Sequence, residues 1–378
     1  MTVRTSPINP SVLSWGLAQD GRTLGEIAAA LKIERAELVS WSVGESEPRV
    51  GQVSDLAGVL HRPRVFFFLP EAPAEGAIPD GFRHPPGGGA RSVSSTVLLE
   101  ARRAKRVQQA IASTVANDNR PEVPLASINE SPVLAAEKVR SWLGLGEPTR
   151  WGDEYQALRW WRSILEASGV LVFELQLGKD AVRGFAGWDD RAPMIVVNSS
   201  SVTPAARIYT IGHELAHLLL REATACLEPT GGNLTINTRT ERWCERFAAD
   251  LVMPADAVRQ LMEHEAVGDE AATIDTVKAM MARFRVSARA AALRLNDLGY
   301  APDGLYAAVL SIFRTRKGSQ GGKAFSPPRH RMRLRQYGTP VVTAVLDALP
   351  PNDAMSVLRM DVEDVRKLAD EVPGVPAY

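Results

Sequence analysis

The stretch that decides the fold is residues 203–220, TPAARIYTIGHELAHLLL. Thr203 followed by Pro204 predicts a helix start, because a threonine hydroxyl caps the first turn and proline suits the first helical position. Apolar residues then recur at helical spacing to the end of the stretch. His213 and His217 are four residues apart, so the helix places both imidazoles on one face.

These two histidines belong to an H-E-x-x-H motif, His213-Glu214-Leu-Ala-His217. Two imidazoles on one helix face can bind a single Zn²⁺ ion. Glu214 is rotated from them by one residue, so it can reach a water molecule without binding the metal, as a general base must. A solvated polar face is the simpler interpretation, but the neighbouring positions are apolar. The motif therefore predicts a zinc site beside a buried core.

A catalytic zinc site needs a third protein ligand. The next predicted helix lies in TERWCERFAADLVMP, residues 240–254, and it offers Glu241 and Glu245, one turn apart. In zinc peptidases of this type a carboxylate on a downstream helix completes the site, and the residue one turn on hydrogen-bonds a ligand histidine. We expect Glu241 to be the ligand and Glu245 to be that supporting partner; the reverse assignment stays open.

Upstream of the motif the pattern is mixed α and β. Two amphipathic helices are predicted, in residues 131–145 and 154–169. Three short runs bounded by turn residues have the character of β-strands. They are GVLVFEL (169–175), VRGFAGW (182–188) and PMIVVN (193–198).

The N-terminal residues predict a bundle of short helices. TLGEIAAALKI (23–33) offers Thr23 as a cap and Glu26 as the other half of a capping box. RAELVSW (35–41) and VSDLAGVLH (53–61) follow after short breaks, which is a helix-turn-helix pattern.

DNA binding through this module is one interpretation, since four cations could face phosphates. They are Arg22, Lys32, Arg35 and Arg49. The second helix, however, begins at Glu34 and contains Glu37, and carboxylates there would repel phosphate. DNA binding and protein docking both stay open.

Composition sets further bounds. The chain has 378 residues, with 44 basic and 44 acidic side chains, so no overall field attracts nucleic acid or membrane. Two cysteines exclude a disulfide scaffold. The first residues lack the apolar segment of a signal peptide, and no apolar run is long enough to span a bilayer. We predict a cytoplasmic protein with no membrane partner.

The expected fold class is α+β, in four parts. Residues 71–92 are rich in Pro and Gly and predict a linker. The parts are a helix-turn-helix domain (1–75), a linker with a helix (76–120), a metallopeptidase domain with a small sheet (121–260) and a mainly helical C-terminal region (261–378).

Residues 150–255 resemble the ImmA/IrrE family of metallopeptidases. The resemblance is carried by GHELAHLLL (212–220), by ERWCERFAADLVMP (241–254) and by the strand segments before them. Residues 25–60, with W-S-x-G-E-x-x-P at their turn, resemble the XRE-type helix-turn-helix found fused to such peptidases. Family members commonly have Asn at the position of Glu245, and we interpret Cys244 as a packed thiol.

The resemblance implies a gluzincin-like fold, a Zn²⁺ cofactor and hydrolysis of a protein partner, such as a helix-turn-helix repressor in a stress or phage response. PMIVVN is the expected edge strand, on which an extended substrate could pair. His330 and Tyr209 are candidates for stabilising the oxyanion, although an ordinary surface position is the simpler interpretation of His330. Two alternatives are a DNA-binding regulator whose peptidase-like domain is a sensor, and a non-catalytic interaction protein.

Overall fold

The structure is a computed structural model. It describes residues 5–18, 20, 22–60, 62–72, 95–146, 150–178, 182–200, 202–221, 225–226, 238–265, 271–313 and 327–372. The chain divides into two compact units, Met1–Lys105 and Arg106–Tyr378, and each is described by itself.

The first unit is a bundle of short helices around a core that includes Leu38, Trp41 and Leu56. The predicted capping box is confirmed: the Thr23 hydroxyl accepts from the Glu26 amide, and the Glu26 carboxylate accepts from the Thr23 amide. Its elements are α1 (Pro10–Ala18), α2 (Leu24–Leu31), α3 (Arg35–Val43), α4 (Val50–Val59) and the 3-10 helix η1 (Arg64–Phe68).

A long helix, α5 (Ser95–Thr114), crosses the boundary between the units. In the second unit the Gln108 side-chain amide donates to the carbonyls of Gly187 and Ala192. These two bonds attach α5 to the sheet of that unit. The predicted linker, residues 71–92, lies almost entirely outside the described residues.

The second unit contains a four-stranded mixed sheet of order β1-β3-β2-β4. The three predicted strands are confirmed, and a two-residue strand that the sequence did not reveal is added. β1 and β3 are parallel, whereas β2 is antiparallel to both of its neighbours. The strands are β1 (Leu171–Leu175), β2 (Gly184–Gly187), β3 (Met194–Asn198) and β4 (Ala225–Cys226).

The expectation that PMIVVN is an edge strand is wrong. It forms β3, which pairs with β1 on one side and with β2 on the other. All five residues of β3 are buried. A strand without polar alternation is typical of the middle of a sheet covered on both faces.

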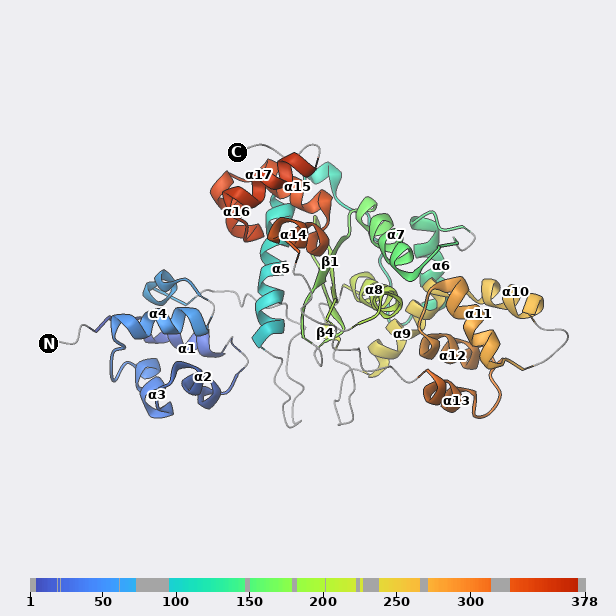
Figure 1. The fold of residues 1–378 in the computed structure, drawn as a ribbon, viewed down its shortest axis with the longest axis horizontal. Coiled ribbons are helices and arrows are strands. Elements are labelled where there is room, and N and C mark those ends of the chain that lie inside the picture. Colours follow the sequence, from blue (N-terminus) through green and yellow to red (C-terminus); the bar gives the residue numbers. More distant parts are fainter. Residues whose placement is uncertain are drawn as a thin grey trace. The chain divides into compact units, whose positions relative to one another are not determined.

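Helices cover the sheet and position the motif. α8 packs against β2 and β3, and α7 and α9 pack against α8 in turn, with α6 against α9 (Figure 1). Their bounds are α6 (Pro132–Trp142), α7 (Glu154–Ala167), α8 (Pro204–Leu219) and α9 (Thr238–Val252). α9 begins at Thr238, two residues before the predicted segment 240–254.

Two further groups of helices follow, and Figure 1 shows them as separate clusters. In the last group, α14 contacts β1. The Arg162 guanidinium of α7 donates to the Arg335 carbonyl of α14 at 2.8 Å, and Tyr337 meets Phe173 edge-on. The groups are α10 (Ala255–Glu265), α11 (Ile274–Phe284), α12 (Ala288–Asp297) and α13 (Leu305–Ile312), then α14 (Arg329–Tyr337), α15 (Thr339–Ala348), α16 (Pro351–Leu358) and α17 (Val362–Glu371).

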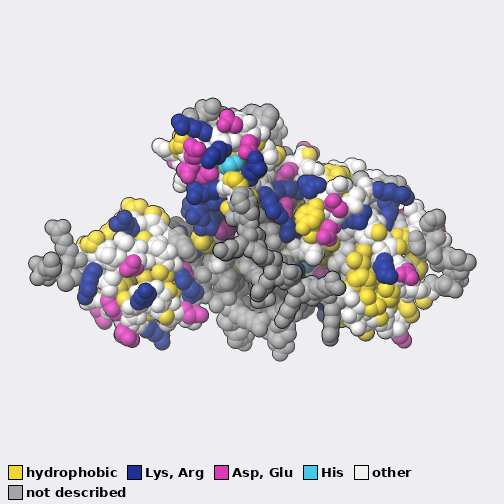
Figure 2. Space-filling view, viewed as in Figure 1, with side chains coloured by type: hydrophobic (Ala, Val, Ile, Leu, Met, Phe, Trp, Pro, Cys, Tyr) yellow, Lys and Arg dark blue, Asp and Glu magenta, His cyan; other side chains and the backbone are white. Residues whose placement is uncertain are grey.

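Hydrophobic side chains gather on the surface over α11–α13 (Figure 2). Leu293 of α12 and Leu310 and Ile312 of α13 are exposed. Within the described residues, no helix combines the length and the apolar character needed to cross a membrane.

Candidate metal centre

Two packed helices, α8 and α9, carry the motif residues. The predicted start of α8 is confirmed, because the Thr203 hydroxyl accepts from the Ala206 amide and Pro204 is the first helical residue. Gly212 lets the two helices approach closely: a Cβ there would lie 3.4 Å from the Ala248 Cβ of α9. The two helices therefore pack closely at the residue before His213.

Three donor groups from these helices converge. Nε2 of His213 lies 3.3 Å from Nε2 of His217. Oε2 of Glu241 lies 3.2 Å from Nε2 of His213, and its Oε1 lies 3.6 Å from Nε2 of His217. Both imidazoles are buried, and Glu241 is partly exposed. The sequence-predicted ligands thus lie together.

The spacing of these atoms fits zinc. Zinc–nitrogen bonds of about 2.0–2.1 Å in a tetrahedron hold donor atoms roughly 3.3 Å apart. The three observed separations, from 3.2 to 3.6 Å, match that value. Two imidazoles and a carboxylate also form the donor set of hydrolytic zinc sites that keep a position open.

Glu214 lies on the same helix, against the sheet. Its side chain is fully buried. A Cβ built on Gly184 of β2 would come 3.1 Å from Glu214 Oε1 and 2.6 Å from the Val196 carbonyl oxygen. The glycine therefore gives the carboxylate the room to lie against the strand.

The two histidines have opposite pKa shifts. Burial lowers the pKa of His213, but its hydrogen bond to the Glu241 carboxylate and the charges of Glu214, Glu241 and Glu245 raise it, and the net shift is upward. Burial, and then the nearby charge of His213, lower the pKa of His217 to about 3. Of the two rings, His213 is therefore the one on which a proton is favoured, beside the Glu241 carboxylate.

Of these two neighbours on α9, Cys244 is a packed thiol, as the sequence predicted, whereas the Glu245 side chain is at the helix surface. Glu245 is exposed, and its backbone carbonyl accepts a 2.9 Å hydrogen bond from the Tyr209 hydroxyl. Cys244 is fully buried, with Sγ 3.7 Å from Nδ1 of His217. Two features of the sequence could have indicated that Cys244 lies near the metal site. It is three residues after Glu241, which places both on one side of the helix, and apolar positions follow it on α9.

The two oxyanion candidates are engaged elsewhere. The Tyr209 hydroxyl donates to α9, and burial raises the pKa of Tyr209. The expected surface position of His330 is wrong, because it is buried on α14. Its Nε2 lies 3.4 Å from Glu371 Oε1, and its Nδ1 lies 3.9 Å from Asp364 Oδ1. Both side chains thus have contacts that hold them within the scaffold.

The four predicted DNA-facing cations are on the first unit. Arg22 is half-buried, forms an ion pair with Asp20 and donates to the Val59 carbonyl at 2.7 Å. Lys32, Arg35 and Arg49 are exposed at the ends of α2, α3 and α4. Of the four cations, Arg22 is therefore held in place by contacts within the first unit.

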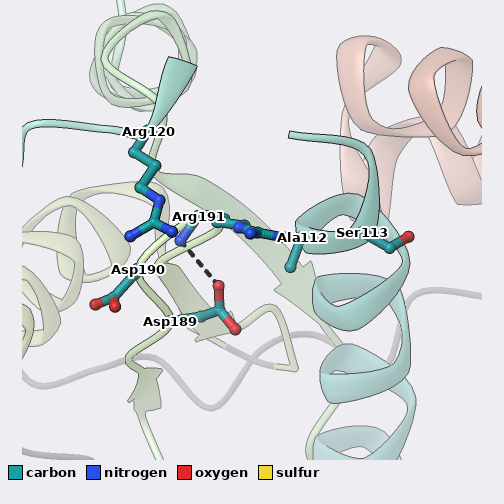
Figure 3. Close-up of a pocket in the computed structure, with 6 residues that line it drawn as sticks. All are labelled: Ala112, Ser113, Arg120, Asp189, Asp190 and Arg191. Carbon is teal, nitrogen blue, oxygen red and sulfur yellow. Dashed lines mark hydrogen bonds between the residues drawn. The ribbon is translucent and has the colours of Figure 1, made fainter. Parts of the chain in front are cut away.

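An open pocket of about 360 Å³ has none of the motif residues in its lining (Figure 3). Its walls come from the end of α5, the segment after it and the turn between β2 and β3. The Asp189 carboxylate accepts from the backbone amides of Arg191 and Ala192. The lining residues are Ala112, Ser113, Arg120, Asp189, Asp190 and Arg191.

Comparison with known proteins supports a peptidase-like domain in this part of the chain. The peptidase M78 family model, described as an IrrE N-terminal-like domain, matches residues 165–296, about a third of the chain. The match contains the strands, the motif helix and α9, and it supports the ImmA/IrrE resemblance. The chain thus carries a metallopeptidase-like domain. No curated protein matches the chain.

Proposed function

We propose that this protein is a zinc-dependent endopeptidase that cleaves a protein partner. The observation that carries the proposal is the convergence of His213, His217 and Glu241, whose donor atoms lie 3.2–3.6 Å apart. The match to a peptidase family supports the reaction class. The three side chains would hold the zinc ion.

A zinc ion bound there supplies Lewis-acid chemistry to a substrate carbonyl and to the attacking water. Glu214 then takes the proton of the attacking water and passes it to the leaving amine. Its burial between α8 and β2 keeps competing solvent away from the carboxylate. An intact glutamate between two ligand histidines favours catalysis, because a pure scaffold needs no general base.

The proposed substrate is a helix-turn-helix regulator, cleaved in a stress or phage response. The family resemblance is the support for this substrate class. β3 is an interior strand, so a substrate strand does not pair with it. On the other side of β3, the outer strand β1 contacts α14.

For the first unit we propose protein docking rather than DNA binding. Glu34 precedes α3 and Glu37 lies in its first turn. The visible face of this unit mixes basic and acidic side chains without a basic stripe (Figure 2). Phosphate binding requires a concentration of cations on one face.

The test of the peptidase function is cleavage of a proteome-derived peptide library, with new termini identified by mass spectrometry. The zinc-loaded wild type should produce cleavage products. Glu214→Gln should lower their yield at least about 100-fold, because it removes the proton acceptor. Glu245→Gln is the matched control, since that carboxylate is exposed on α9, and it should cleave like the wild type. Equal cleavage by Glu214→Gln would contradict the proposed mechanism.

A further inference from the structure

Cys244 contacts the side of the His217 ring that is opposite to the predicted metal-binding nitrogen. Sγ of Cys244 approaches Nδ1 of the imidazole at 3.7 Å. Nε2, on the other side of the same ring, faces His213 and Glu241. Both side chains are fully buried, so water does not replace this contact.

A neutral imidazole carries one proton, on Nδ1 or on Nε2. A histidine that binds metal through Nε2 must hold its proton on Nδ1, and the group that accepts this N–H fixes both the tautomer and the ring orientation. A thiol sulfur is a weak acceptor and needs no ionisation for this role.

We propose that Cys244 is a positioning residue for the metal site: its Sγ accepts the Nδ1–H of His217 and so keeps Nε2 unprotonated and directed at the metal. The inference rests on the proposed zinc-dependent function. It gives the buried thiol the supporting role that the sequence had suggested for Glu245.

The competing interpretation is that Cys244 is itself a metal ligand. Its Sγ and one nitrogen of each histidine lie within 4.8 Å of one another. The Glu241 oxygens, however, lie 3.2 and 3.6 Å from the two Nε2 atoms. A metal held by both Nε2 atoms would have the His217 ring between itself and the sulfur, so Sγ would not be one of its ligands.

The test is zinc affinity, measured by competition with a chromophoric chelator, in three full-length proteins. Cys244→Val fills similar space without an acceptor and should bind zinc about 10-fold more weakly than the wild type. Cys244→Ser keeps an acceptor and should stay close to the wild type. Thermal melts of the metal-free proteins control for folding. Equal affinities for all three proteins would overturn the inference.

Cobalt replacement separates positioning from ligation. Cobalt bound by nitrogen and oxygen alone lacks the intense near-ultraviolet charge-transfer band that a thiolate ligand produces. We expect no such band in the wild type, and a band that disappears in Cys244→Ser would overturn the positioning role. If the wild type binds no zinc, the proposed function fails as well. If it binds zinc and Cys244→Val binds equally, only this inference fails.

Discussion

Gly184 of β2 lies directly against Glu214 of α8, so close that a Cβ on the glycine would stand 3.1 Å from the carboxylate oxygen. The same Cβ would lie 2.6 Å from the Val196 carbonyl oxygen and 2.8 Å from Thr210 Cγ2. The first of these atoms belongs to the backbone of β3, which cannot move without disturbing the sheet. Contacts with the sheet therefore fix the position of Glu214, the proposed general base.

Gly184→Ala should destabilise the protein by about 1–3 kcal/mol, because an extra methyl group overpacks a rigid site. Denaturant unfolding measures the change. Gly146→Ala is the control, since nothing lies within 4 Å of a Cβ there, and its effect should stay within about 0.5 kcal/mol. Equal stability of both variants would show that β2 shifts freely.

Glu241→Gln should weaken zinc binding more than about 10-fold, because it replaces a charged ligand with a neutral amide. Glu245→Gln, one turn later on the same helix, should bind zinc like the wild type, since that side chain is exposed. Chelator competition measures both affinities. The reversed order would make Glu245 the ligand.

Zinc affinity should fall as the pH falls. The raised pKa of His213 means that a proton competes with the metal at a higher pH than for an ordinary histidine. Below that pKa we expect affinity to drop about 10-fold per pH unit. His217, with its pKa lowered to about 3, should add no second proton. Competition titrations across the neutral and mildly acidic range give the slope; an affinity independent of pH would contradict this assignment.

Arg162→Met should destabilise the second unit by about 3–5 kcal/mol, because it removes a buried partner from two carboxylates. The guanidinium contacts Glu166 at 2.7 Å and Glu174 at 3.3 Å. Burial already raises the pKa of Glu166 despite Arg162, so a lower pH should protonate this carboxyl and restore part of the stability.

Urea unfolding at two pH values measures both effects of Arg162→Met. Arg159→Met, on the exposed face of the same helix, is the matched control and should change stability by less than about 0.5 kcal/mol. A comparable loss in both variants would mean that the buried pairing contributes little.

Much of the site could be predicted because the sequence features that indicate it, helical spacing and helix caps, depend only on neighbouring residues in the chain. The i, i+4 spacing places His213 and His217 on one helix face whatever the tertiary fold. The cap at Thr203 and the box at Thr23 with Glu26 depend on a single turn of chain, and both are present. Glu241 followed from the requirement for a third ligand on the next helix.

Strand order and the rotation of α9 could not be predicted in this way, because both depend on tertiary packing. Nothing local in PMIVVN shows which strands flank it, although its lack of polar alternation is typical of an interior strand. β4 has only two residues, too few for a pattern. α14 is dominated by charged residues, and only His330 and Tyr337 are buried in it, so periodicity did not reveal it.

The most direct test of the account is the zinc content of the purified protein, measured by elemental analysis after exchange into metal-free buffer. We predict about one zinc ion per chain in the wild type and in Glu214→Gln, because that residue does not bind the metal, and far less in His213→Ala and His217→Ala. A wild type without stoichiometric zinc, or zinc retained when both histidines are replaced, would contradict the metal centre.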